Sequence, residues 1–154
     1  MAKRTLKGVS PNAQYNITER ITEAKQLRPS DSGKLFYITR QASDNFVINL
    51  PKLSDVKPGW HIQLVQSNKA TNPTVSGFWS IVTYGTLSKD GTAGTVDDEK
   101  VVLFRVSSDT TTYDDSCEGA AFNADEGNMC YVETDGDLWF FTCFSDSAPA
   151  VVNG

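Results

Sequence analysis

The single histidine and the three cysteines are the side chains of this sequence best suited to act as a base or a nucleophile. His61 lies in an alternating apolar run, residues 60–64, and would have to serve as the base of any serine or cysteine triad. The chain contains no G-x-S-x-G sequence, which marks a nucleophile elbow, and neither of the glycine patterns that cradle phosphate groups. We therefore predict no catalytic residue and assign His61 a structural place in a strand.

Acidic side chains are abundant, with 19 Asp and Glu residues in total. Two carboxylates in a cleft would suit glycoside hydrolysis, but so many acids supply pairs without indicating any one of them. Asp109, Asp114, Asp115 and Glu118 offer the hard oxygen ligands that calcium prefers, yet they lack the spacing and the glycine of an EF-hand. We predict no metal and no cofactor, and we treat these acids as solvated loop residues.

The cysteines show no C-x-x-C spacing, and with one histidine they do not indicate a zinc site. Two hairpin registers bear on a disulfide. A two-residue turn at Asp135-Gly136 places Cys143 diagonally from Cys130, about 7–8 Å away and beyond disulfide reach. A turn at Gly136-Asp137 places the two cysteines directly opposite each other. We favour the first register, which predicts free, buried thiols at Cys117, Cys130 and Cys143.

Turn-forming residues punctuate the chain at short intervals and separate runs of five to eight residues rich in Val, Ile, Thr and aromatic side chains. The turns fall at residues 31–33, 43–45, 57–59, 71–73, 89–91, 107–109 and 135–136. No long helical pattern and no sequence repeat of the solenoid or propeller type is visible. This pattern predicts an all-β, antiparallel sandwich or barrel.

Several runs alternate in the way expected of half-buried strands. Phe36 and Ile38 point to one face and Leu35 and Tyr37 to the other, and a similar alternation over residues 46–50 ends at a proline. Further strands are predicted at residues 59–65, 78–83 and 101–106, followed by a closing hairpin over 127–140.

The order and spacing of these strands and turns, over roughly residues 27–144, resemble the small β-barrel or jelly-roll module of tailed-bacteriophage capsid decoration (cement) proteins, which also occurs in tail-fibre proteins. The acidic segment 117–126 is longer than that module would have, which leaves strand pairing open over residues 107–128. The resemblance implies a single antiparallel jelly roll and a homotrimer on the outer surface of the phage head. It also implies that the trimer bridges major capsid proteins and stabilises the expanded shell.

Basic residues are concentrated near the N-terminus. Residues 1–28 hold six Lys and Arg against two Glu, whereas the rest of the chain holds eight basic and 17 acidic groups. A basic arm on an acidic body suits contact with an acidic surface, although a solvated terminus explains the same composition equally well. Ile17, Ile21 and Ala24 have helical spacing, but we favour a strand over residues 23–28.

We divide the chain into an extended N-terminal arm (residues 1–28), a β-sandwich or jelly-roll body (29–146) and a C-terminal tail (147–154). With the resemblance, the arm is expected to reach across the shell and to supply most of the capsid contact. The predicted contact residues are Lys3, Arg4, Leu6, Lys7, Val9, Tyr15, Ile17, Arg20 and Ile21.

Nucleic acid and membrane are not expected partners. An acidic body would repel a duplex, no apolar run approaches the length of a membrane span, and the N-terminus lacks the apolar core of a signal peptide. We therefore expect synthesis in the bacterial host cytoplasm.

The alternative function is a glycan- or receptor-binding module of a tail fibre, with Trp79, Trp139, Phe140 and Phe141 as a stacking platform, although alternation sends about half of such a set into the core.

Overall fold

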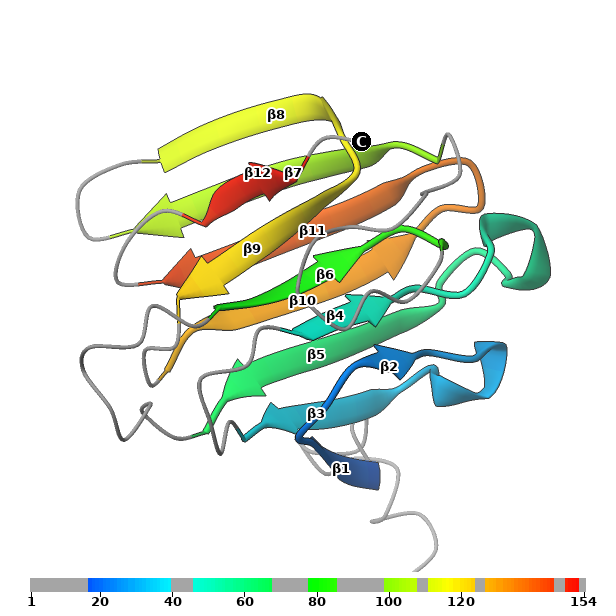
Figure 1. Cartoon of the computed structure of the whole chain (residues 1–154). Coiled ribbons are helices and arrows are strands. Elements are labelled where there is room, and N and C mark those ends of the chain that lie inside the picture. The colour runs from blue at the N-terminus through cyan, green and yellow to red at the C-terminus, as the bar shows by residue number, and fades with distance from the viewer. Residues whose placement is uncertain are drawn as a thin grey trace, which may run out of the picture.

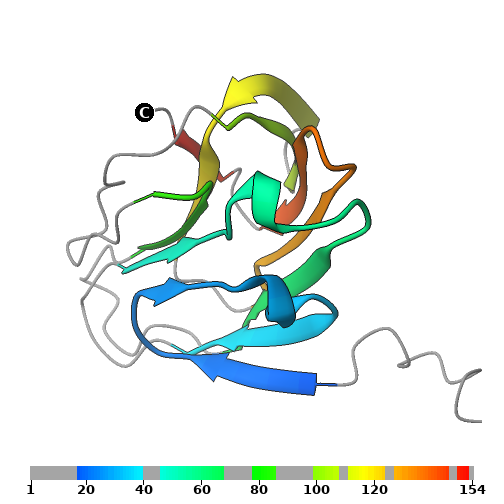
Figure 2. The same ribbon diagram turned by 90° about the vertical axis from the view of Figure 1, so that its right-hand side faces the viewer.

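The structure is a computed structural model that describes residues 17–39, 46–67, 78–85, 99–107, 111–123, 127–145 and 149–152. The described strands form two sheets that face each other, as Figure 1 and the perpendicular view in Figure 2 show. The seven-stranded sheet has the order β1-β3-β5-β10-β11-β7-β8, and the five-stranded sheet has the order β12-β9-β6-β4-β2. The predicted all-β sandwich is confirmed.

The strands are short, as the spacing of turn residues predicted. Those of the seven-stranded sheet are β1 (Ile17–Ile21), β3 (Lys34–Ile38), β5 (His61–Gln66), β7 (Val101–Ser107), β8 (Thr111–Cys117), β10 (Met129–Thr134) and β11 (Trp139–Ser145). Those of the five-stranded sheet are β2 (Lys25–Gln26), β4 (Phe46–Asn49), β6 (Phe78–Val82), β9 (Gly119–Asn123) and β12 (Ala150–Val152). Two single turns of 3-10 helix, Pro29–Asp31 and Leu53–Asp55, complete the described elements.

The first six strands alternate between the two sheets. The chain passes from β1 to β2, from β3 to β4 and from β5 to β6, and it changes sheet at each step. Consequently β1, β3 and β5 run parallel in one sheet, and β2, β4 and β6 run parallel in the other. This half of the molecule is wound like three successive coils of a flattened solenoid.

Mixed sheets correct the predicted antiparallel order. β7 also runs parallel to β11, whereas the pairs β5–β10, β10–β11, β7–β8, β6–β9 and β9–β12 are antiparallel. The antiparallel jelly-roll order was predicted because the sequence shows only a succession of strands and turns, and a run with period two says nothing about the direction of its neighbour. The segment left open, residues 107–128, holds β8, which pairs with β7, and β9, which pairs with β6 and β12.

The closing hairpin exists, but its register is the one that was not favoured. Four residues, 135–138, separate the paired residues Thr134 and Trp139, so Cys130 lies directly opposite Cys143. A two-residue type I′ turn would require a positive φ at Asp135, and no described non-glycine residue has one. Instead the Asp135 carboxylate accepts hydrogen bonds from the backbone N–H groups of Asp137 and Leu138, each at 2.9 Å.

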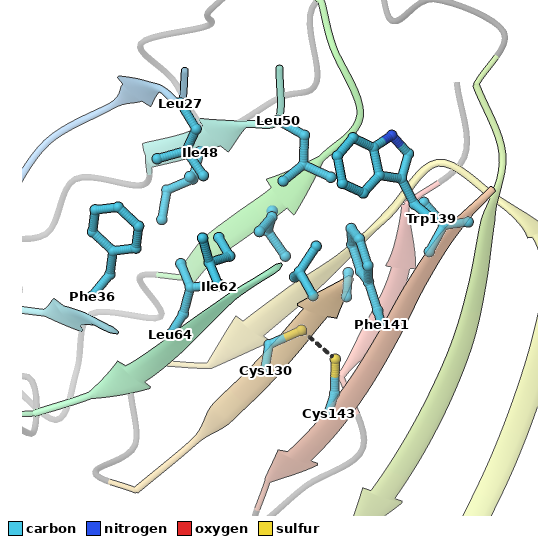
Figure 3. Packing of buried hydrophobic residues seen from close by; sticks show 14 of the residues in the cluster. Leu27, Phe36, Ile48, Leu50, Ile62, Leu64, Cys130, Trp139, Phe141 and Cys143 are labelled. Atoms are coloured by element: carbon cyan, nitrogen blue, oxygen red, sulfur yellow. Dashed lines mark hydrogen bonds between the residues drawn. The ribbon is translucent and has the colours of Figure 1, made fainter. Parts of the chain in front are cut away.

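The core lies between the two sheets and is rich in aromatic side chains (Figure 3). Trp60 and Trp139 pack edge to face with ring centroids 5.4 Å apart, and Trp79 stacks on Phe122 at 4.2 Å. Two of the three indoles donate hydrogen bonds: Trp60 Nε1 to Pro29 O at 2.9 Å and Trp139 Nε1 to Glu99 Oε2 at 3.0 Å. These bonds satisfy polar groups that would otherwise be costly to bury.

Both predicted domain boundaries shift. Residues 17–28 belong to the sandwich, because β1 pairs with β3, β2 pairs with β4, and both Ile21 and Leu27 lie in the core cluster. The arm predicted over 1–28 therefore loses its last twelve residues to the body, and its remainder lies outside the described residues. At the other end, β12 pairs with β9, so part of the tail predicted over 147–154 completes the five-stranded sheet. In the described part of the chain, no helix is long and apolar enough to cross a membrane.

Candidate interaction surface

The predicted contact residues of the arm fall into three groups. Lys3, Arg4, Leu6, Lys7, Val9 and Tyr15 lie outside the described residues. Ile17 and Arg20 are exposed on β1, with Ile17 at 58% exposure. Ile21 is only 2% exposed and belongs to the core cluster, so its predicted role as a capsid anchor is wrong for this conformation. Its alternation with Arg20 along β1 explains this burial.

A cluster of ion pairs links β1 to β2 and β3. Glu19 pairs with Lys25 of β2 and, at 3.0 Å, with Lys34 of β3, and Lys34 also pairs with Asp31 at 2.6 Å. The hydrogen bond from Lys25, followed by that from Lys34, holds the pKa of Glu19 below its ordinary value even though burial opposes this. The bonds to Asp31 and Glu19 raise the pKa of Lys34. These charges are therefore already paired within the chain.

The outer face of the seven-stranded sheet, directed away from the five-stranded sheet, is the most distinctive surface of the described structure. In β3, β5, β7, β10 and β11 the buried side chains occupy alternate positions, and the residues between them are half-buried or exposed. Most of the outward side chains are apolar or aromatic: Leu35, Tyr37, Val65, Val102, Phe104, Val106, Tyr113, Met129, Tyr131, Phe140 and Phe144. In Figure 2 no described element covers this face, which we call the outer apolar face.

Aromatic residues lie on neighbouring strands of the outer apolar face. Phe104 of β7 lies opposite Tyr113 of β8 on one side and opposite Thr142 of β11 on the other, and Thr142 in turn lies opposite Tyr131 of β10. Phe144 packs edge to face against Tyr131 with ring centroids 6.4 Å apart. Their exposed fractions are 41% for Phe104, 61% for Tyr113, 37% for Tyr131 and 40% for Phe144. Four large exposed rings on one sheet face are more than isolated surface apolar residues, and this makes the face a candidate interaction site.

An open depression of about 470 Å³ lies within this face, over β5, β10 and β11. Tyr131 and Phe144 supply its aromatic lining, and His61, Glu133 and Thr142 supply polar groups. The Nδ1 atom of His61 lies 2.9 Å from Gly59 O, which orients the ring against its own strand. The depression thus combines aromatic faces with hydrogen-bonding groups, as small-molecule binding sites do.

Charge is almost absent from the outer apolar face. Of its described side chains only Arg20 at the β1 edge and Glu133 on β10 carry formal charge at neutral pH, whereas the whole chain carries 33 charged Lys, Arg, Asp and Glu residues. Depletion of charge together with enrichment in Tyr, Phe and Met is typical of the core of a protein–protein interface.

Three of the four aromatic residues weighed as a stacking platform for the alternative function are buried, which agrees with the expectation that strand alternation sends at least two of them into the core. Trp79, Trp139 and Phe141 lie in the core, and Phe140 alone is half-buried on the outer apolar face. The rings that are exposed, in particular Phe104 and Phe144, were missed. The signal for them is present in residues 101–106 and 139–144, where apolar side chains occupy both alternating positions instead of alternating with polar ones.

The acidic cluster considered for calcium is not assembled in the described residues. Asp109 lies outside them, Asp114 lies on β8, and Glu118 is buried with its Oε1 3.7 Å from Lys100 Nζ. Among the residues whose side chains are described, no group of three His, Cys, Asp or Glu side chains is arranged to hold a metal ion.

Comparison with known proteins gave no match at any of three levels: protein-family models, curated proteins and solved structures.

Proposed function

We propose that this chain is a structural virion protein, a capsid decoration (cement) protein of a tailed phage. In this proposal it binds the outer surface of the head as a homotrimer and stabilises the expanded shell by bridging major capsid proteins. The observation that carries the proposal is the outer apolar face, which gives a small β-domain a broad protein-binding surface. The resemblance over residues 27–144 suggested this function, and the strands of that region lie in mixed sheets and not in a jelly-roll order.

The size of the outer apolar face suits a protein partner. Seven strands spaced about 4.8 Å apart span roughly 29 Å, and strands of five to seven residues are about 17–23 Å long. The product, roughly 500–650 Å², approaches the ~800 Å² that one partner buries in a standard interface. Such a face, repeated three times in a trimer, would engage several capsid subunits at once and gain avidity from each added contact.

The chemistry of the face supports a protein surface as the occupant. A nearly uncharged, aromatic face gains from burial in proportion to the apolar area that it removes from water, roughly 25 cal/mol per Å². Nucleic acid would instead require positive charge along the contact, and among the side chains that the structure describes on this face only one Arg and one Glu are charged.

Co-sedimentation with expanded heads of the parent phage, stripped of this chain, tests the proposal. The double variant Phe104→Ser/Tyr113→Ser removes two exposed rings from the face, and we expect at least a tenfold loss of affinity. The control Asp55→Ser/Lys57→Ser changes two exposed residues outside the seven-stranded sheet and should bind like the wild type. Circular dichroism and the unfolding midpoint verify folding. Wild-type protein that does not bind heads would refute the proposal, and equal binding by the ring variant would exclude this face.

The depression supports the second candidate, a glycan-binding module of a tail fibre. Tyr131 and Phe144 offer ring faces for sugar C–H groups, while Glu133 and Thr142 can bond hydroxyls. A glycan array probed with wild-type protein and with Tyr131→Ala distinguishes the two functions. Binding to a defined glycan that Tyr131→Ala abolishes, without binding to heads, would favour the tail-fibre module.

A further inference from the structure

Cys130 and Cys143 face each other in the interior of the molecule. They are directly paired residues on the antiparallel strands β10 and β11, and both are fully buried in the core cluster. Their Sγ atoms lie 2.9 Å apart, and a dashed line joins them in Figure 3. This separation is shorter than the roughly 3.5–4.0 Å at which non-bonded carbon atoms pack, so no other atom lies between the two sulfurs.

Backbone geometry at this position permits a covalent bond. Directly opposed residues of an antiparallel pair have Cα atoms about 4.5–5.5 Å apart, which lies within the roughly 4.4–6.8 Å spanned by disulfides. Cys117 is excluded as a partner by its place in the sheet, because β8 is separated from β11 by β7. Two strand spacings amount to about 9–10 Å, which is too far for a bond to either of the other cysteines.

We propose that Cys130 and Cys143 are a modification site and form a cross-strand disulfide when the chain meets a low-molecular-weight disulfide such as glutathione disulfide, whereas Cys117 stays a thiol. One of the paired cysteines, as its thiolate, attacks a glutathione sulfur. The S–S bond of glutathione breaks, and the leaving glutathione thiolate takes up a proton. The second cysteine, also as its thiolate, then attacks the protein sulfur of the mixed disulfide and expels the second glutathione.

Atoms and electrons balance in this exchange. The two protein thiols lose two protons and two electrons, and glutathione disulfide is reduced to two glutathione thiols. The structure itself has all three cysteines as thiols, which is the starting state of the reaction.

Burial controls the rate of the exchange and not its outcome. β10 lies between β5 and β11, so glutathione reaches the sulfurs only when the hairpin separates from the sheet. Burial, with the contact to Cys143 as a further cause, also raises the pKa of Cys130 well above its ordinary value, so that little Cys130 thiolate exists in the folded chain. We therefore expect slow oxidation of the native protein and fast oxidation during refolding.

The timing of the modification rests on the proposed function. Cytoplasmic thiols stay reduced, whereas disulfides persist on particles outside the cell. A virion protein would thus be assembled as the dithiol and oxidised after release. The test below uses the purified chain alone, so a failure of the disulfide and a failure of capsid binding are separate results.

The experiment incubates the purified, reduced chain with glutathione disulfide in two ways, natively and during refolding from urea. Remaining thiols are then alkylated under denaturing conditions and the peptides are mapped by mass spectrometry. We expect peptides joined through Cys130 and Cys143, lighter by two hydrogen atoms than the dithiol, and an alkylated Cys117. Oxidation should raise the unfolding midpoint by on the order of 5 °C, because the bond closes a loop in the unfolded chain and so lowers the conformational entropy of that chain.

Matched variants separate the site from general cysteine oxidation. Cys117→Ser should form the bond and show the rise in midpoint, whereas Cys143→Ser should show neither. Three alkylated cysteines after refolding in glutathione disulfide, or a bridge that includes Cys117, would overturn the proposal. Wild type and Cys117→Ser suffice for this decision if Cys143→Ser does not fold.

Discussion

Gly119 begins β9 at a point where its backbone lies against β6 of the same sheet. A Cβ atom built on it would meet Ile81 O and would lie 2.8 Å from Val82 Cγ1 and 2.9 Å from Val82 Cα. Backbone atoms cannot move aside as a flexible side chain would. This residue therefore has to be glycine for β9 to pair with β6.

We predict that Gly119→Ala lowers the free energy of unfolding by about 1–3 kcal/mol, the usual cost of overpacking. Urea denaturation at neutral pH measures the change. Gly59→Ala serves as a control, because a Cβ there meets no atom within 4 Å and the cost comes only from its φ of +88°. If Gly119→Ala lowers the free energy of unfolding by less than Gly59→Ala does, the backbone of Gly119 does not lie close to β6 in solution.

Carboxylates that are held ionised in the folded chain give its stability a pH dependence. The pKa of Glu19 is lowered chiefly by the hydrogen bond from Lys25, and the pKa of Asp135 is lowered by the backbone N–H groups of Asp137 and Leu138. In the acid range the unfolded chain therefore binds more protons at these two groups than the folded chain does. Their contribution is present above the unfolded pKa values and is lost as the pH falls through the folded ones.

We predict that stability falls below about pH 4 and that Glu19→Gln flattens this fall. The raised pKa of Lys34 has the opposite sign: its contribution is complete below its ordinary pKa and is lost as the pH rises through the folded value, at strongly alkaline pH. Urea denaturation from pH 3 to pH 7 measures the acid limb. Parallel curves for wild type and Glu19→Gln would mean that the ion pairs at β1 contribute nothing in solution.

At the scale of elements, the boundary between arm and body determines what a truncation does. Deleting residues 1–22 removes β1, its pairing with β3 and the buried Ile21, whereas deleting 1–16 leaves every described strand in place. We predict that the longer deletion costs about 3 kcal/mol or more relative to the shorter one, mainly through the lost apolar burial. Thermal unfolding of the two truncated chains measures this difference. Equal midpoints would show that β1 is not part of the stable sandwich.

Sequence patterns predicted β2 to β7, β10 and β11 because each pattern is local, but they did not predict β1, β8, β9 or β12. The alternation of apolar residues predicted β3, in which Phe36 and Ile38 are buried while the residues between them point outward. The alternating run that begins at Trp60 predicted β5. Direction and partner are not local properties. The parallel coils formed by β1 to β6 were not predicted because the number of residues from one coil to the next differs. Ile17 lies opposite Lys34, but Leu35 lies opposite Gln63, so the sequence has no repeat of fixed length.

The outer apolar face was not predicted from the sequence, for a related reason. Composition drew attention to the basic residues of 1–28, yet Lys25 is paired within the chain and Ile21 is in the core. The outer apolar face draws its rings from β7, β8, β10 and β11, which become neighbours only through the sheet order. The Asp-Gly pair predicted a two-residue turn and hence the wrong hairpin register. The Asp135 side chain instead stabilises a four-residue loop through its hydrogen bonds to the backbone.

At the scale of the whole molecule, charge and apolar surface are segregated. The chain carries a formal charge of −5, with its excess of basic groups near the N-terminus, while the outer apolar face is nearly neutral. Contacts made by exposed charges weaken as salt shortens the Debye length from about 10 Å at 0.1 M to about 3 Å at 1 M. Apolar burial does not weaken in this way. The salt dependence of binding therefore distinguishes a contact made by the basic N-terminal residues from one made by the outer apolar face.

We predict that capsid binding has two parts with different responses to salt. Removal of residues 1–16 should lower occupancy on expanded heads at 0.1 M salt but have little effect at 1 M, because the basic groups act through screened charge. Phe104→Ser/Tyr113→Ser should lower occupancy at both salt concentrations, because the rings act through burial. Quantitative co-sedimentation across this range provides the measurement. If the ring variant retains full occupancy at 1 M salt, the outer apolar face does not meet the shell and residues elsewhere in the chain must hold it there.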